Sequence, residues 1–182
     1  MVLELKRSGR RISQKQCAAK AMETQIKVSH QQVPVKSSYE TFRKNLEKIV
    51  NKLDPELASD MLKAPETLKE YLAGLGGVTG LIIFGTQSHG DLLRIVGKPG
   101  KAIQYVIGNP LIAIQMTVHD IRAALYAPLR MIVYEDNNGQ VVVEYDQPST
   151  LFGQFGNDDI MKVAVDLDIK MLNAINMADQ YQ

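Results

Sequence analysis

The pattern of apolar and polar residues along the chain predicts an alternation of strands and helices. Short apolar or alternating runs bounded by Gly, Pro, Asn or Ser predict strands at about 25–35, 80–85, 103–107, 129–135 and 140–145. Apolar residues at helical spacing predict helices after the first, third and fifth of these strands. This order indicates one α+β domain whose chain ends in a long helix.

The first helix is expected to begin at the pair Ser37-Ser38, whose side chains are good N-caps, with Glu40 in its first turn. Its core-facing positions are Tyr39, Phe42, Leu46, Ile49, Val50 and Leu53. The following segment, at about 55–77, predicts two short helices because Ala64-Pro65 interrupts the helical pattern and glycines end it. We interpret this segment as a helical insertion beside the main sheet.

The central stretch from Ala102 to Pro148 has the most informative pattern. After a strand, Gly108 frees the backbone, Asn109 is a fitting N-cap, and Pro110 suits the first position of a helix. That helix is expected to continue to Ala127-Pro128. Its apolar stripe, which we expect to pack on the sheet, consists of Ile114, Val118, Ile121 and Leu125.

The last third of the chain predicts a hairpin and a terminal helix. Asn138-Gly139 lies between two strands and favours a type I′ turn, in which both central residues take positive φ angles. A short helical turn is expected from Ser149 to Phe155. Asn157 then caps a long helix whose apolar face is formed by Ile160, Val163, Leu167, Met171, Ala174 and Ile175.

Charge changes this picture only at the N-terminus. Over 182 residues, 21 basic side chains nearly balance 20 acidic ones, so no general attraction to nucleic acid or membrane is implied. Residues 1–30 nevertheless hold seven basic and two acidic side chains, a net charge of +5. We therefore divide the chain into a basic arm at 1–24, a single domain at 25–165, and the remainder of the C-terminal helix at 166–182.

Composition also bears on the cellular compartment in which we expect the protein. Cys17 is the only cysteine, which excludes an internal disulfide or a Cys-based zinc site within one chain, and we interpret it as an incidental thiol. No apolar run reaches the roughly 18 residues that a membrane span needs. The first residues lack the apolar core of a secretion signal. The cytoplasm is thus the default location, unless a leader has been removed.

Two histidines are the strongest candidates for chemistry. His89 lies in the polar segment TQSHGD after an apolar strand, where an imidazole can act as a general base or a ligand. The simpler interpretation is a loop histidine bonded to the backbone. His119, one helical turn from Met116, suggests a haem or copper ligand, or more simply a half-exposed surface residue. The histidines show no paired metal-ligand spacing, so we predict no metal site and leave the cofactor undetermined.

Two other features have functional interpretations. The N–H groups that follow Gly108-Asn109 form a helix N-terminus, which attracts anions. Near the hairpin ends lie four carboxylates suited to acid–base work or to a hard cation: Glu135, Asp136, Glu144 and Asp146. The simpler interpretation of these carboxylates is solvated charge.

A set of residues in the second half carries a family resemblance: Gly108-Asn109-Pro110, Pro128-Leu129, Val133-Tyr134-Glu135-Asp136, Gly139, Val141, Val143, Tyr145 and Pro148. They resemble the uncharacterised bacterial and archaeal family called domain of unknown function 302. His89 is similar to the histidine of an Asp-His pair in that family, with Ser88 in place of the Asp, and Ile107 stands where the family has an aromatic residue. The resemblance covers about 25–165 and leaves out the insertion.

The resemblance implies a fold rather than a reaction. It implies a strongly bent antiparallel sheet with two helices on one face, similar to the TATA-box-binding-protein-like class, and a tendency to self-associate. The family has no established reaction, so it assigns no catalytic residue.

Our leading hypothesis is a module without evident catalysis that binds a small ligand or a partner and acts as a homodimer. It rests on the absence of a nucleophile, base and orienting group in one recognisable set, and on the self-association that the resemblance implies. The ligand would lie in the bend of the sheet, near Gly108, Asn109 and His89. The alternative is a metal- or haem-assisted enzyme or redox-related protein that uses His89. A second alternative is nucleic-acid binding through the basic arm, although no aromatic residue within the arm is placed to stack on bases.

Overall fold

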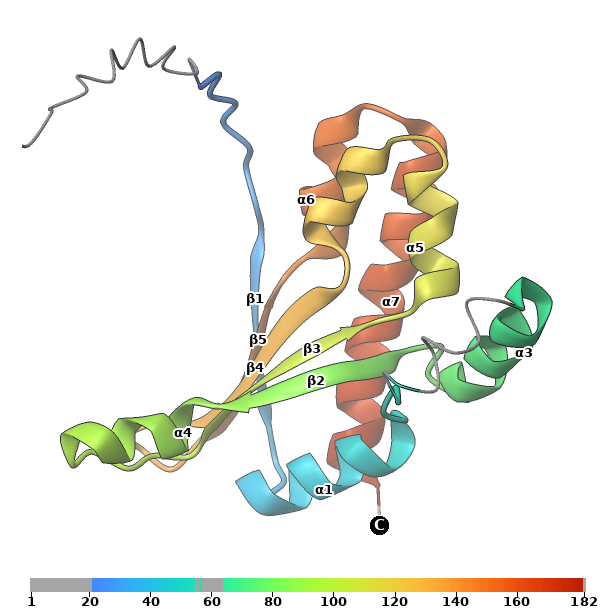
Figure 1. The fold of residues 1–182 in the computed structure, drawn as a ribbon. Helices are drawn as coiled ribbons and strands as arrows, with labels where there is room; N and C mark the ends of the chain where they lie inside the picture. The colour runs from blue at the N-terminus through green and yellow to red at the C-terminus, as the bar shows by residue number, and fades with distance from the viewer. Residues whose placement is uncertain (1–20, 55, 57–63, 182) are drawn as a thin grey trace, which may run out of the picture.

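The structure, a computed structural model, describes residues 21–54, 56 and 64–181, and its centre is a five-stranded antiparallel sheet (Figure 1). The strand order across the sheet is β1-β5-β4-β3-β2. The strands are β1 His30–Val35, β2 Ile82–Ser88, β3 Ala102–Gly108, β4 Leu129–Glu135 and β5 Val141–Asp146. The five strands and the antiparallel sheet predicted from the sequence are therefore confirmed.

Alternation along the strands gives the sheet one buried face. In β5, Val141, Val143 and Tyr145 are buried, whereas the residues between them are partly exposed. The register continues this face across the sheet, because Val143 lies opposite Val33 on one side and Val133 on the other. A bulge interrupts the pairing of β2 with β3 between Ile83 and Gly85.

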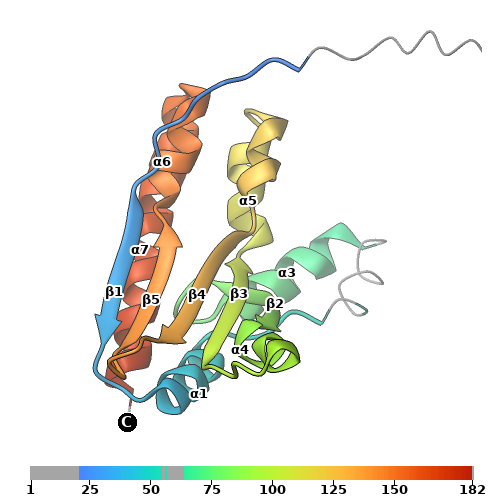
Figure 2. The same ribbon diagram turned by 90° about the vertical axis from the view of Figure 1, so that its left-hand side faces the viewer.

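The main helices lie behind the buried face of the sheet (Figure 2). They are α1 Tyr39–Ile49, α5 Pro110–Thr117, α6 Pro148–Phe152 and α7 Asp158–Gln180. Their apolar residues join those of the strands in one core. The predicted caps are present, because the Ser38 side chain accepts the N–H of Thr41 and the Asn157 side chain accepts two N–H groups of α7.

Polar contacts fix the C-terminal helix against the start of α1. The Asn45 amide donates to the carbonyl oxygens of Ala178 (2.9 Å) and Tyr181 (3.0 Å). The Asp179 carboxylate accepts the N–H groups of Lys36 and Ser37. The end of α7 is therefore tied to the segment that connects β1 with α1.

The remaining helices lie in the connections between these elements. They are α3 Pro65–Gly76, α4 His89–Leu92 and the 3-10 helices η1 Leu93–Val96, η2 Ile121–Tyr126 and η3 Gly153–Phe155. α3 begins at the predicted break, Pro65, and the short turn at 148–155 was also predicted. The other half of the predicted insertion, and nearly all of the basic arm with Cys17, lie outside the described residues.

The structure shows that the central helix was predicted wrongly. α5 ends at Thr117, and Asp120 starts a separate 3-10 helix by accepting the N–H and the guanidinium of Arg122. The buried side chains here are Ile112, Met116 and Ala123. The predicted stripe faces solvent instead, with exposed fractions of 58–79% for Ile114, Val118, Ile121 and Leu125. A single helical period cannot describe a segment that restarts in its middle.

Two strand ends and one turn also differ from the predictions. β1 begins at His30 rather than near 25, and β2 continues to Ser88, so most of the expected polar loop before His89 belongs to a strand. The β4–β5 turn is not type I′, because Gly139 has positive φ but Asn138 does not. The Asp136 side chain accepts the N–H groups of Asn138 and Gln140, which stabilises a different turn.

Candidate functional site

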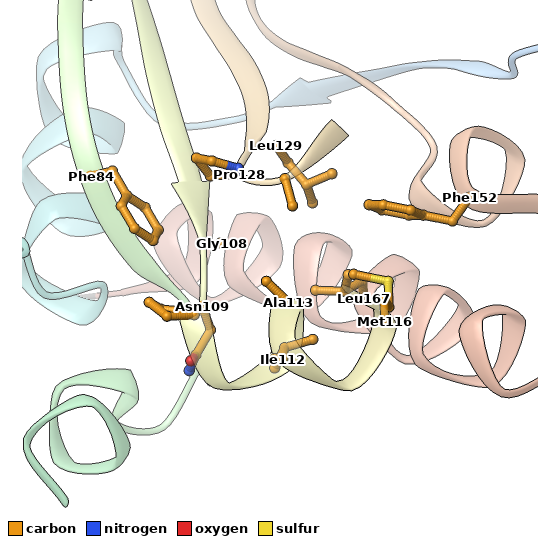
Figure 3. Close-up of a pocket in the computed structure, with 12 residues that line it drawn as sticks. Phe84, Gly108, Asn109, Ile112, Ala113, Met116, Pro128, Leu129, Phe152 and Leu167 are labelled. Atoms are coloured by element: carbon orange, nitrogen blue, oxygen red, sulfur yellow. The ribbon is translucent and has the colours of Figure 1, made fainter. Parts of the chain in front are cut away.

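An apolar pocket of about 220 Å³ lies where β3 ends and α5 begins. Figure 3 shows Ile112, Ala113 and Met116 of α5 on one side and Pro128 and Leu129 at the start of β4 on the other. The lining consists of Phe84, Gly108, Asn109, Pro110, Ile112, Ala113, Met116, Ala127, Pro128, Leu129, Phe152 and Leu167. No charged side chain lines it, so the pocket suits an uncharged, apolar molecule.

The Gly108-Asn109-Pro110 motif shapes one end of this pocket. A Cβ atom at Gly108 would lie 3.4 Å from Cβ of Pro128 and 3.8 Å from the Phe84 ring, which are ordinary van der Waals distances, so both residues lie directly beside the glycine. The Asn109 amide donates to the carbonyl oxygen of Gly80 (2.9 Å), and its oxygen accepts the N–H of Leu111 (2.9 Å). Asn109 therefore fixes the entry into α5 from both sides.

The same contacts use the N–H groups on which an anion site at this helix start would depend. Pro110 has no N–H, and the Leu111 N–H bonds to the Asn109 side chain. The N–H groups of Ile112 and Ala113 donate to the Asn109 carbonyl oxygen at 3.0 and 2.9 Å. The helix start has satisfied its own donors, which leaves none of these groups directed at a ligand.

His89 lies outside this pocket. It follows Ser88 at one end of β2, whereas Gly108 is paired with Ile82 at the other end of the same strand. Asp91, the nearest acidic neighbour in sequence, is bonded to Ser88 (2.6 Å) and to Arg94 (3.0 Å), and the Ser88 hydroxyl and then the Arg94 guanidinium lower its pKa. The structure therefore brings Gly108 and Asn109 together but not His89, and Asp91 does not orient the imidazole.

His119 also stands apart from the pocket. It is exposed in the turn between α5 and η2, while Met116 is buried and lines the pocket. Within residues 21–54, 56 and 64–181, no three His, Cys, Asp or Glu side chains are placed to hold a metal ion. The same residues contain no helix with the length and apolarity needed to cross a bilayer.

The four hairpin carboxylates do not form one cluster. Glu135 pairs with Lys101 at 2.8 Å and Asp136 supports the turn. At the other end of β5, Glu144 and Asp146 each lie at hydrogen-bond distance from one ring nitrogen of His30, at 2.8 and 2.9 Å. These bonds, first that to Asp146 and then that to Glu144, raise the pKa of His30.

Sequence analysis did not identify His30, because its partners lie more than 110 residues away and depend on the β1–β5 register. A buried tyrosine of β3 was also not identified, because its partner Glu47 lies 58 residues away in the sequence. The Tyr105 hydroxyl donates to Glu47 (2.9 Å), and Lys52 bonds the other oxygen of that carboxylate (2.6 Å). Burial raises the pKa of Tyr105, so the phenol is a hydrogen-bond donor rather than a nucleophile. We interpret this network as support for the core.

Comparison with known proteins gives a family but no activity. No curated protein matches the chain. A solved structure described as an uncharacterized conserved protein DUF302 from Bacillus stearothermophilus matches with a TM-score of 0.58 at 16% identity, over 82% of this chain and 97% of the other. This likeness shows a shared fold.

The family model for the domain of unknown function DUF302 matches residues 56–178. The resemblance was placed at about 25–165 without the insertion, whereas the match begins at 56, includes the insertion and continues to 178, so those limits were wrong. It covers more than half of the chain and the whole of the Gly108-Asn109 site. The chain therefore belongs to the DUF302 family.

Proposed function

We propose that this protein is a binding module without evident catalysis, whose ligand is a small, uncharged, apolar molecule held in the pocket beside Gly108 and Asn109. The observation that carries the proposal is the chemistry of the lining. Aromatic and aliphatic side chains surround the space, and the Asn109 amide, the one polar side chain there, is already bonded to Gly80 and Leu111. A charged substrate would lose its hydration in this pocket without gaining a partner.

The pocket volume limits the size of the ligand. Engineered apolar cavities of about 150 Å³ take up benzene, and this pocket holds about 220 Å³. We therefore expect ligands of one small ring or a short branched chain. His89 is not assigned a part in this binding, because it lies at the opposite end of β2.

Methionine methyl NMR with benzene as the probe tests the proposal directly. Met116 lines the pocket and is 1% exposed, whereas Met131, similarly buried at 2%, does not line it. Benzene should shift the Met116 signal and leave that of Met131 in place. An unchanged Met116 signal at saturating benzene would refute the proposal.

A pair of alanine substitutions supplies a matched control. Ala113→Phe should fill the pocket and reduce benzene binding about tenfold or more, because the added ring occupies the ligand's space. Ala73→Phe makes the same change on the exposed side of α3, away from the lining residues, and should bind as the wild type does. Equal binding by both variants would place the benzene site elsewhere.

We also propose that two copies of the chain pair through the outer side of α7. Four apolar residues recur there at helical spacing, with exposed fractions of 37–55%: Met161, Val165, Ile169 and Leu172. Both lysines of α7 are paired within the helix, because Lys162 pairs with Asp159 and Lys170 with Asp166. A second copy thus meets an apolar row without an unpaired lysine beside it.

Sedimentation of the full chain tests this pairing. Ile169→Glu should raise the dimer dissociation constant about tenfold or more, because it places a carboxylate in the apolar row of both copies. Ile95→Glu, on an exposed aliphatic residue in another region, is the matched control and should leave the dimer intact. A wild-type monomer at high concentration would contradict the pairing.

The sheet also supports a proposal about fold class. Five antiparallel strands with the main helices on one side are what we expect of the TATA-box-binding-protein-like class. We assign the domain to that class, and superposition on solved members of the class is the check.

A further inference from the structure

The connection between β2 and β3, residues 89–101, carries a group of exposed aliphatic side chains. We call these residues the tip. Figure 1 shows α4, at the start of the tip, extending beyond the ends of β2 and β3 on the side away from α5 and α3. Every residue from 91 to 100 is exposed. Four of them are large aliphatic residues: Leu92 (47%), Leu93 (45%), Ile95 (83%) and Val96 (66%).

The tip is held in one shape by contacts at its base. A Cβ atom at Gly90 would lie 2.0 Å from the carbonyl oxygen of Gly100, so the two ends of the tip touch through backbone. The Gly100 N–H donates to the Gly90 carbonyl oxygen, and that of Lys98 donates to Leu93. An ordered turn therefore presents the aliphatic side chains to the outside instead of folding them inward.

Basic residues accompany these aliphatic ones. Within the tip, Arg94, Lys98 and Lys101 stand against a single carboxylate, Asp91. Arg94 pairs with Asp91 and Lys101 with Glu135, in exposed ion pairs of the kind that contribute little to stability. Lys98 has no ion pair in the described part of the chain. The apolar row of α7 differs, because both lysines of that helix, Lys162 and Lys170, pair with carboxylates.

We infer that the tip attaches the protein to the surface of an anionic lipid bilayer, with Ile95 and Val96 inserted among the lipids and Lys98 among the headgroup phosphates. A peripheral attachment of this kind takes two signals, apolar area and basic charge, and the tip supplies both. The bilayer interface also accepts a convex group of side chains, whereas a protein partner needs a complementary hollow.

A second copy of the chain fits the tip less well. On a second copy, the tip could enter the apolar pocket at the other end of β3, which has an apolar lining and a volume of about 220 Å³. A contact between the tip of one copy and the pocket of the next would be head-to-tail, which builds open chains rather than a closed dimer. The lipid surface is therefore the occupant that the shape and charge of the tip favour.

Tryptophan fluorescence of the full chain gives a direct test, because the sequence contains no tryptophan. In the variant Ile95→Trp, vesicles that contain phosphatidylglycerol should move the emission to shorter wavelength, and vesicles of phosphatidylcholine alone should have a much smaller effect. Val78→Trp, at a residue just after α3 that is 80% exposed, is the matched control and should show no shift with either. Equal shifts for both variants, or none for Ile95→Trp, would overturn the inference.

Vesicle flotation extends the test to the wild-type side chains. The double variant Ile95→Ser, Val96→Ser should bind anionic vesicles about tenfold more weakly or worse, and Lys98→Glu should also weaken binding. Added salt should weaken wild-type binding because it screens the headgroup charge. If the serine variant instead floats as the wild type does, or loses self-association in sedimentation, the tip contacts something other than lipid.

Discussion

Both ends of the β2–β3 pair carry apolar side chains, but these are covered by helices at one end and exposed to solvent at the other. At one end, Gly108 and Asn109 lead into α5, and side chains from α5, α6 and α7 close around a pocket. At the other end, the tip holds four aliphatic residues that are 45–83% exposed. The difference lies in what stands opposite each end, because helices cover the first and no described helix covers the second. The aliphatic side chains at the two ends differ in exposure because helices pack over one end and not over the other. For this reason the two ends suit different partners.

Alanine substitution of two isoleucines, one near each end, should give the largest difference in stability between the two ends. Ile107→Ala should lower the free energy of unfolding by about 2–5 kcal/mol, because Ile107 is 1% exposed and its loss leaves a cavity in the core. Ile95→Ala should change it by less than about 0.5 kcal/mol, since Ile95 is 83% exposed. Urea denaturation of both variants measures the contrast. Equal losses would mean that the tip is buried in the protein in solution.

Two glycines test whether the tip is a defined structure. Gly90→Ala should cost about 1–3 kcal/mol, because the new Cβ would overlap the Gly100 backbone oxygen and force the two ends of the tip apart. The control, Gly74→Ala, lies within α3 with nothing near its Cβ position and should stabilise the protein by about 0.5–1 kcal/mol. Thermal unfolding distinguishes the two signs. A neutral Gly90→Ala variant would show that the tip rearranges freely.

Asn109 tests the entry into α5. Asn109→Ala removes the cap on Leu111 and the bond to Gly80, and should cost about 1–2 kcal/mol. Asn109→Asp keeps an acceptor for the cap but turns a second acceptor toward the Gly80 carbonyl oxygen, so it should also lower the free energy of unfolding. Asn173→Ala, on the exposed side of α7, is the control and should be close to neutral. If Asn109→Ala were as mild as Asn173→Ala, the motif would not hold the pocket open.

Local sequence signals were sufficient to predict most of the sheet. Alternating runs such as 129–135 and 141–145 fix which face is buried, and the caps at Ser38 and Asn157 depend on residues within three positions. The central helix could not be predicted in the same way. Ile114, Val118, Ile121 and Leu125 have helical spacing, but Asp120 restarts the chain and the stripe faces outward. Periodicity shows which residues can share a face, but it does not show that something covers that face.

The candidate site was predictable only in part. Gly108 and Asn109 line the pocket because their motif is local, whereas Phe84, Phe152 and Leu167 come from three other elements and carry no sequence signal of their own. His89 was grouped with Gly108 because a strand sequence does not show which of its ends meets which neighbour. The β2–β3 register decides that question and places the two residues at opposite ends.

Titration of His30 gives the smallest expected effect and sharpens the comparison of the two ends of the sheet. The bonds to Asp146 and then Glu144 raise the pKa of His30 above its ordinary value of 6.5, so the folded state binds the proton more tightly than the unfolded state. The resulting stabilisation is fully present below pH 6.5 and is lost as the pH rises through the folded-state pKa. Because His30 is half exposed, the loss relative to His30→Gln should stay below about 1 kcal/mol. Urea denaturation at a series of pH values from about 6 to 8 measures it.

The groups that face His30 should not obscure this signal. Hydrogen bonds first from Tyr134 and then from His30 lower the pKa of Glu144, and the bond to Glu144 raises that of Tyr134, so both move away from neutral pH. The matched variant is Lys101→Met, which breaks the Lys101–Glu135 pair beside the tip. That pair contains no imidazole, so the difference between this variant and the wild type should stay constant across the same pH range. If the free energy of unfolding of His30→Gln also differed from that of the wild type by the same amount at every pH, the bonds of His30 to its two carboxylates would not depend on protonation. The pocket end of the sheet would then be no more sensitive to pH than the tip end.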